Sequence, residues 1–154
     1  MFSATMEYAL RAVVYLAAQS GRACVSQEIA EAMQVPQGYM AKVLQNLRRS
    51  GILHSQRGLN GGFVLKRPAD KITILDVVNA VDTVPRVKSC PLGLKEHRHQ
   101  LCPLHKQLDE AGACIERVFS SHTIDAMVVN SDSGKDPRSK VDVFARSLPR
   151  TAEP

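Results

Sequence analysis

The sequence predicts a mainly α-helical fold that carries one small β-hairpin. Two observations lead to this prediction. Apolar residues recur at helical spacing in successive stretches before residue 82, and again in one long stretch that starts near residue 101. Within the first part, a segment rich in glycine and asparagine separates two short runs of β-type residues, which is typical of a tight hairpin.

The composition is that of a globular protein. Of the 154 residues, 44% are hydrophobic and 23% are charged, so a wholly disordered or fibrous chain is excluded. The sequence has no apolar run of 18 residues and no leader pattern at its start, so we expect a cytoplasmic location. In that compartment, free thiols or metal ligands are expected rather than disulfides for the four cysteines: Cys24, Cys90, Cys102 and Cys114.

The first helix is expected from Ser3 to Ser20, because apolar residues follow one of its faces and Gly21 comes after its last turn. A second, short helix should follow and end at Met33. Ser26 is predicted to be its N-cap, because acidic support for the first turn comes directly after it.

A third helix should begin at or just after Pro36 and end before Gly51. Its buried side is expected to consist of Tyr39, Met40, Val43, Leu44 and Leu47. Its opposite side is polar and basic, and contains Lys42, Gln45, Asn46, Arg48 and Arg49. A short helix, a tight turn and a donor-rich helix in succession indicate a helix-turn-helix.

The hairpin and a fourth helix complete this part of the chain. Short β-type runs at residues 52–55 and 62–65 flank the glycine-rich turn, and together they predict a wing. Thr73 is the expected N-cap of a helix within residues 72–81 that packs back on the first helix. Residues 1–82 are therefore predicted to form a winged helix-turn-helix domain.

The remaining chain divides into three expected parts. Residues 83–101 form a loop that carries cysteine chemistry, residues 102–130 contain a long amphipathic helix from Cys102 to Met127, and residues 131–154 are a disordered tail. The apolar stripe of the long helix fits a partner helix, so we interpret the helix as a dimerisation element. The stripe consists of Leu101, Leu104, Leu108, Ile115 and Val118.

The charge is uneven along the chain. Residues 1–73 contain nine basic and four acidic residues, which accounts for the whole formal net charge of +5, and the rest of the chain is neutral. A basic N-terminal half favours a module that binds a polyanion. The alternative is a solvated basic face without a ligand.

Five segments of this sequence closely resemble one known family: Gln37–Leu47, Ser50–Leu53, Arg57–Leu65, Arg67–Pro68 and Ile72–Asp82. The resemblance is to the winged-helix transcriptional regulators of the Rrf2 family, of the IscR, NsrR and CymR types, and it covers residues 1–127. It implies a homodimeric, sequence-specific regulator that binds double-stranded DNA at a near-palindromic operator. We expect this regulator to be a repressor.

The residues that would contact DNA follow from the polar helix face and from the resemblance in the wing. They are Ser26, Gln37, Gly38, Tyr39, Lys42, Gln45, Asn46, Arg48, Arg49, Arg57, Asn60 and Gly61.

The cysteine loop carries candidate metal ligands. Cys102 and His105 are one helical turn apart, so a sulfur and an imidazole can face the same point, and Cys90 precedes Cys102 by twelve residues. Such donors suit an iron-sulfur cluster or zinc.

The resemblance also implies a ligand set, which this sequence matches only in part. Cluster-binding members have three evenly spaced cysteines, and Glu96 stands here where the middle one is expected. Glu7 falls where some members place an acidic ligand that is donated from the other subunit.

Three interpretations of this loop remain open. The first is a cluster with two irons and two sulfides that senses nitric oxide, redox state or iron status. The second is zinc, or a thiol pair that forms a disulfide. The third is a metal-free regulator that responds to a metabolite or a protein partner.

Enzymatic function is not expected. The sequence has no phosphate-binding glycine-rich loop that opens a helix, no nucleophile elbow and no closely spaced cysteine pair. Cys24 and Cys114 are expected to be small buried residues. His54 and His122 have no clustered partner and are expected to be structural or exposed.

Overall fold

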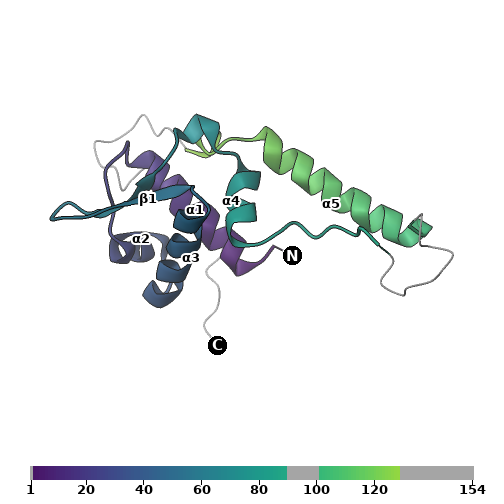
Figure 1. Cartoon of the computed structure of the whole chain (residues 1–154), viewed down its shortest axis with the longest axis horizontal. Coiled ribbons are helices and arrows are strands. Elements are labelled where there is room, and N and C mark those ends of the chain that lie inside the picture. The colour runs from purple at the N-terminus through teal and green to yellow at the C-terminus, as the bar shows by residue number, and fades with distance from the viewer. Residues whose placement is uncertain (1, 90–100, 129–154) are drawn as a thin grey trace.

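The computed structural model describes residues 2–89 and 101–128. A compact body contains the first four helices and the hairpin, and helix α5 projects from it (Figure 1). This confirms the predicted fold class. The elements in chain order are α1 (Ala4–Ala18), α2 (Ser26–Met33), α3 (Gln37–Arg49), β1 (Leu53–Gln56), β2 (Gly62–Leu65), the 3-10 turn η1 (Ala69–Lys71), α4 (Ile74–Val81), α5 (Pro103–Ser121) and the 3-10 turn η3 (Asp125–Met127).

Helix α1 is the centre of the body. It packs against α2, α3, α4 and β2, and its residues Ala9, Ala12 and Val13 are fully buried. The Ser3 hydroxyl caps it by accepting a hydrogen bond of 3.2 Å from the Met6 amide. The first helix was therefore predicted within two residues at each end.

The N-cap prediction for α2 was wrong. Val25 occupies the N-cap position, and Ser26 is the first helical residue. The Ser26 hydroxyl is buried and has no hydrogen-bond partner among the described residues. The helix ends where predicted, at Met33, because Gln34 takes a left-handed conformation with φ of 55°.

Helix α3 buries Met40, Val43, Leu44 and Leu47 as predicted, but not Tyr39. Tyr39 is 41% exposed at the first turn, where its ring meets the edge of another tyrosine ring. It lies outside the core because its hydroxyl is 2.7 Å from the Thr5 hydroxyl of α1, a polar contact that an apolar core would not provide.

The hairpin pairs β1 and β2 in antiparallel register, with His54 opposite Val64 and Ser55 opposite Phe63. Its base is bonded to the body, because the backbones of Phe63 and Cys24 exchange hydrogen bonds of 2.8 and 3.1 Å. The hairpin projects from the body (Figure 1).

Helix α4 begins at the predicted N-cap. The Thr73 hydroxyl accepts from the Asp76 amide at 3.0 Å, and the Asp76 carboxylate accepts from the Thr73 amide at 3.1 Å. The helix packs on α1 as expected, and its residues Val77 and Val78 are fully buried.

The predicted long helix is shorter than expected, since α5 ends at Ser121 rather than at Met127. The chain then turns back, and the Ile124 amide donates to the Ile72 carbonyl at 2.8 Å. Ile124 is completely buried in the main core. Burial of this side chain, together with the strand-like pairing, outweighs continuation of the helix.

Three further predictions concern α5 and the segments around it. Cys114 is exposed rather than buried, although the neighbouring residue Ile115 packs against the small core. Cys90, Glu96 and residues 131–154 lie outside the described residues.

No helix in the described part combines the length and apolar composition needed to cross a bilayer.

Candidate nucleic-acid interface

One face of α3 is exposed along its whole length. Gln37, Gly38, Lys42, Gln45 and Arg48 are all exposed on it, and the buried residues of the same helix hold it against α1 and α4. Arg49 is also exposed, and Asn46 is half-buried. The helical period thus separates a core side from a side rich in hydrogen-bond donors, as the sequence predicted.

A hollow of about 480 Å³ joins this face to the wing. Arg48 spans its edge, where a guanidinium nitrogen donates to the Ser55 hydroxyl of β1 at 3.4 Å. Gly38 and Ala41 leave room at one end, because neither has a long side chain. The hollow is lined by Gly38, Ala41, Lys42, Gln45, Arg48 and Phe63.

The charge of this region has one sign. Between Glu31 and Asp70 the sequence has no acidic residue. Six cationic side chains lie in the same interval: Lys42, Arg48, Arg49, Arg57, Lys66 and Arg67. One of the six, Arg67, pairs with Asp76 of α4 at 3.4 Å. The excess of positive charge attracts polyanions such as the phosphates of nucleic acid.

The tip of the wing presents polar and cationic groups to solvent. Arg57 and Asn60 are exposed, and Gly61 is half-buried by the turn itself. The Gly61 amide donates to the Gly58 carbonyl at 2.9 Å, which closes the turn. Phe63 is the wing residue that lines the hollow, and strands β1 and β2 connect it to the predicted contact residues at the tip.

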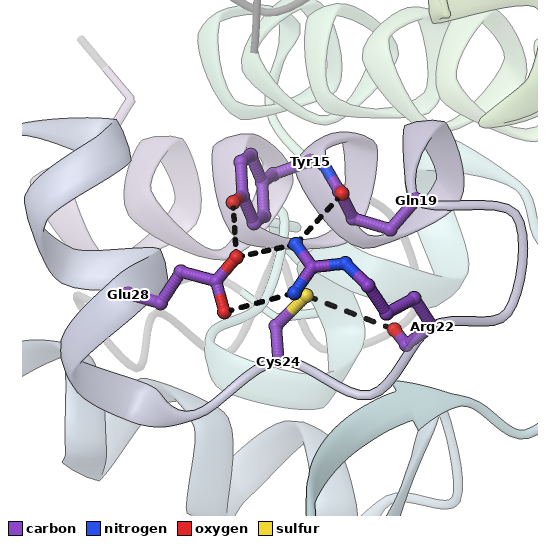
Figure 2. Close-up of polar contacts among 5 residues, drawn as sticks. All are labelled: Tyr15, Gln19, Arg22, Cys24 and Glu28. Carbon is purple, nitrogen blue, oxygen red and sulfur yellow. Dashed lines mark hydrogen bonds and ion pairs between the residues drawn. The ribbon is translucent and has the colours of Figure 1, made fainter. Parts of the chain in front are cut away.

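A polar cluster fixes α2 against α1 (Figure 2). The Tyr15 hydroxyl of α1 donates to the Glu28 carboxylate of α2 at 3.0 Å, and Arg22 pairs with the same carboxylate. Arg22 also donates to the Gln19 side-chain oxygen at 2.9 Å, and the Cys24 thiol donates to the Arg22 carbonyl at 3.7 Å. The cluster therefore ties the first turn of α2 to α1 and to the segment between the two helices.

The environment of the cluster changes its titration. Burial, followed by the hydrogen bond to Glu28, raises the pKa of Tyr15 to about 12. Burial also raises the pKa of the Cys24 thiol to about 11. The hydrogen bonds from Arg22 hold the pKa of the Glu28 carboxyl below its usual range. The carboxylate is therefore charged, and the tyrosine and the thiol are neutral, near neutral pH.

Two of the predicted DNA contacts are placed differently from expectation. The Ser26 hydroxyl is buried, so it does not belong to the exposed donor face. Tyr39 is exposed, but its hydroxyl is engaged with Thr5 and its ring packs edge-on against Tyr8 at 5.5 Å. The contacts of Tyr39 tie the start of α3 to α1.

The candidate metal ligands are brought together only in part. The Cys102 sulfur lies 3.2 Å from Nδ1 of His105, so this predicted pair does converge. Glu7 forms an ion pair with Arg11, one turn further along α1. The described residues contain no group of three or more candidate ligands, and Cys90 and Glu96 fall outside them.

The apolar stripe of α5 is partly open and partly covered. Leu104, Leu108 and Val118 are 66%, 51% and 49% exposed. Leu101 is half-buried, and Ile115 packs against a small core that includes Met6, Val78 and Val84. Ile115 therefore contributes to packing within the chain, which the sequence pattern alone did not distinguish.

Sequence reasoning missed Ala41, Ser55 and Phe63 as residues of this surface. The signal for Ala41 was its position on the helix face of Gly38 and Gln45. For Phe63 it was the alternation along β2, which places Phe63 and Leu65 on the opposite face from Val64. Ser55 gave no signal, because its contact with Arg48 depends on the packing of α3 against β1.

Comparisons with known proteins identify the family of this chain. The family model of the Rrf2 proteins, described as iron-dependent transcriptional regulators, matches residues 2–130. A protein of Aquifex aeolicus (strain VF5), named as an HTH-type transcriptional regulator, is 32% identical over 131 residues, which is 83% of this chain and 91% of that protein. Protein aau3 of Rhizobium meliloti (strain 1021) is 33% identical over 129 residues, covering 79% of this chain and 80% of its own length.

Solved structures show the same fold. The global cysteine regulator CymR (YrzC) of B. subtilis superimposes with a TM-score of 0.68 at 21% identity, covering 82% of this chain and 95% of CymR. T. potens IscR superimposes with a TM-score of 0.69 at 20% identity, covering 88% of this chain and 93% of IscR. These matches confirm the resemblance found in the sequence. The chain belongs to the Rrf2 family of winged-helix transcriptional regulators, which bind DNA and are not enzymes.

Proposed function

We propose that the protein is a homodimeric repressor that binds a near-palindromic operator, with α3 in the major groove and the wing at the neighbouring minor groove. The observation that carries this proposal is the exposed, acid-free face of α3, which the hollow joins to the wing. Lys42 and Gln45 are donors aimed at base edges, while Arg48 and Arg49 are suited to phosphates. Gln37, Gly38, Asn46, Arg57, Asn60 and Gly61 complete the proposed contact surface.

The dimer follows from α5. An exposed stripe of leucines on a helix that projects from the body is costly in water, and a second copy of the same helix would cover it. Leu104, Leu108 and Val118 are the proposed centre of this interface, and Leu101 and Ile115 are its edges. A two-fold dimer would present two α3 helices to major-groove segments about one helical turn apart.

The proposed sensor is the start of α5. Cys102 and His105 provide a sulfur and a nitrogen donor 3.2 Å apart, which fits half of the ligand set of an iron-sulfur cluster or of zinc. Cys90 and Glu96 are the proposed additional ligands from the preceding loop. A bound cluster would supply reversible one-electron chemistry, through which nitric oxide, redox state or iron status could act on DNA affinity.

Glu7 can complete this set only from a second subunit. The Phe2 and Phe119 rings are tilted against each other with centroids 5.4 Å apart, and Glu7 follows Phe2 by five residues, in the first turn of α1. Cys102 precedes Phe119 by seventeen residues of helix, which is about 25 Å along its axis. Glu7 would also have to leave its ion pair with Arg11.

A thiol switch without metal is the second candidate. The imidazole of His105 is placed to accept a hydrogen bond from the Cys102 thiol at 3.2 Å. Cys102 is also the N-cap of α5. Oxidation would then join Cys102 to another thiol, and two electrons would pass to a cellular disulfide or peroxide.

DNA binding is tested with Arg48→Ala and with Arg117→Ala as the matched control, since Arg117 is an exposed arginine on α5. The probe is a duplex selected by the parent protein from a randomised pool. Arg48→Ala should weaken binding to all duplexes about equally and reduce the salt slope by about 1, whereas Arg117→Ala should match the parent. Binding that does not depend on salt would contradict the proposal.

The sensor is tested with Cys102→Ala and with Cys114→Ala as the control, since Cys114 is an exposed thiol on the same helix. Parent protein made with a cluster-assembly system and purified without air should contain iron, sulfide and visible absorbance, and only Cys102→Ala should lose them. Protein without iron or sulfide would exclude the cluster. Stoichiometric zinc, or a disulfide that includes Cys102, would then identify the alternative.

A further inference from the structure

The tip of the wing carries a leucine that nothing covers. Leu59 is 108% exposed, more than any other large hydrophobic side chain in residues 2–89 and 101–128. The second subunit covers the apolar stripe of α5 in the proposed dimer. Leu59 lies on a different element and is not part of that stripe. An apolar side chain that is held fully in water is a candidate for contact with a partner.

The backbone of the turn that holds Leu59 is closely packed. A side chain at Gly61 would bring a Cβ to 2.8 Å from the carbonyl oxygens of Gln56 and Gly58, so the backbone is packed closely around the tip. Gly58 has a φ of 110°, a conformation that other residues rarely adopt. Leu59 is therefore held outward by the turn and does not fold back onto the strands.

The base of the wing is fixed in the same way. A Cβ at Gly62 would lie 2.5 Å from the Cys24 carbonyl oxygen, and the Phe63 amide donates to that oxygen at 2.8 Å. The position of the tip relative to α3 is consequently set by the body of the protein. This matters because unstacking a base step costs free energy, and a side chain inserted between bases must be held in place by its backbone.

The hollow between α3 and the wing defines the path of the DNA. With α3 in the major groove, the sugar-phosphate strand that separates this groove from the next must pass through the hollow beside Lys42 and Arg48. The tip of the wing then meets the adjacent minor groove. Arg57 and Asn60 flank Leu59 there, and no acidic residue lies in the wing to oppose this approach.

We propose that Leu59 is an apolar wedge that enters the minor groove and partly unstacks one base step in each half-site. This inference rests on the proposed DNA-binding function and adds a specificity element to it. Apolar wedges of this kind kink the duplex toward the major groove. Pyrimidine–purine steps such as TA and CA unstack most readily, so the protein would select such a step without any hydrogen bond to its bases.

The test compares Leu59→Ser with Leu59→Ile on a duplex of about 30 base pairs, long enough for two half-sites, that the parent selects from a randomised pool. Energy transfer between dyes at the two ends reports bending, and 2-aminopurine placed under the wing reports unstacking. The parent and Leu59→Ile should bend the duplex and brighten 2-aminopurine at one step per half-site. Leu59→Ser should lose both signals and about tenfold of the preference for a TA or CA step.

The salt slope separates this proposal from DNA binding in general. Leu59→Ser should keep the slope of the parent, because it removes no cation. If Leu59→Ser bends DNA and selects steps as the parent does, or if the parent leaves the duplex straight, the wedge is overturned while DNA binding stands. If the parent selects no sequence, both are overturned. If Leu59→Ser keeps these signals but binds a protein partner of the parent more weakly, Leu59 belongs to a protein-binding surface and the wedge is overturned.

Discussion

The guanidinium of Arg86 forms two parallel hydrogen bonds with the carboxylate of Asp109, from Nε to Oδ1 at 2.8 Å and from Nη2 to Oδ2 at 2.9 Å. The third nitrogen, Nη1, pairs with Glu116, two turns further along α5. The Val87 amide adds a bond of 3.0 Å to Asp109. Through these contacts, the segment that leaves α4 is held along α5.

Gly112 permits this arrangement. It is the buried residue of α5, and a Cβ at this position would lie 2.3 Å from the Pro85 carbonyl oxygen. The chain after α4 can therefore lie directly on α5 and run toward the Cys102 end of the helix (Figure 1). The pairing of Arg86 with acidic residues of α5 thus links the DNA-binding body to the helix that carries the proposed sensor.

Replacing Arg86 with methionine should release this segment from α5. Amide hydrogen exchange in residues 83–89 should become faster, while α1 to α3 should keep the protection of the parent, because the contact is local. Arg117→Met is the control, since Arg117 is exposed on α5 and has no ion-pair partner among the described residues. Equal exchange in the parent and in Arg86→Met would show that apolar contacts alone hold the segment.

The same contact predicts a dependence on pH. Hydrogen bonds from Arg86 lower the pKa of the Asp109 carboxyl below its usual range. A lowered folded-state pKa contributes stability that is present above the ordinary carboxyl pKa and is lost as the pH falls through the lowered value. Protection of residues 83–89 should therefore decline in acid in the parent, and Arg86→Met should not show this decline.

Gly112→Ala should displace the segment by steric contact rather than by loss of charge. The expected result is faster exchange at residues 83–89 and a lower melting temperature, because the Pro85 carbonyl must move away. Gly38→Ala is the control for stability, since no atom lies within 4 Å of a Cβ built there. A melting temperature of Gly112→Ala at or above that of the parent would contradict this packing.

Leu108→Glu should disrupt the proposed dimer without unfolding the subunit. Leu108 is 51% exposed in the single chain, but in a dimer the new carboxylate would be buried without a partner, at a cost of about 3 kcal/mol. Dimerisation should weaken by about a hundredfold. Sedimentation equilibrium measures this, with Gln107→Glu as a control that adds the same charge at a neighbouring exposed position. A Leu108→Glu protein that dimerises like the control would show that this part of the stripe is not in the interface.

Tyr15→Phe should lower the free energy of unfolding near pH 7 by about 1 to 2 kcal/mol, because Glu28 loses a hydrogen bond. It should also change how the free energy of unfolding falls at alkaline pH. The raised pKa values of Tyr15, about 12, and Cys24, about 11, mean that their contribution is complete below the unfolded pKa values and is lost as the pH rises through the folded ones.

Urea unfolding at several alkaline pH values measures this effect. Parent stability should fall as the pH rises above about 9, and Tyr15→Phe should show the smaller fall that Cys24 alone contributes. Tyr8→Phe, which leaves the cluster of Figure 2 intact, should retain the alkaline loss of the parent. If the free energy of unfolding falls by the same amount in Tyr15→Phe and in the parent over this pH range, Tyr15 does not contribute to the alkaline loss of stability.

Elements whose signals are local could be predicted from the amino-acid sequence. The period of apolar residues separated the core side of α3 from the side of Lys42 and Gln45, and Thr73 with Asp76 marked the start of α4. Glycines and Asn60 marked the wing, because a tight turn restricts which residues can occupy it. These signals also carried the family resemblance, which the comparisons confirmed.

Features that depend on contacts between distant segments could not be predicted from local patterns. The end of α5 is set by the burial of Ile124 beside Ile72, and the exposure of Tyr39 depends on Thr5 in another helix. Ile115 and Leu104 have the same place in the stripe pattern, yet only Ile115 meets the body of its own chain. A periodic pattern specifies which side of a helix is apolar but not what covers it, because the covering residues come from elsewhere in the chain or from a second copy.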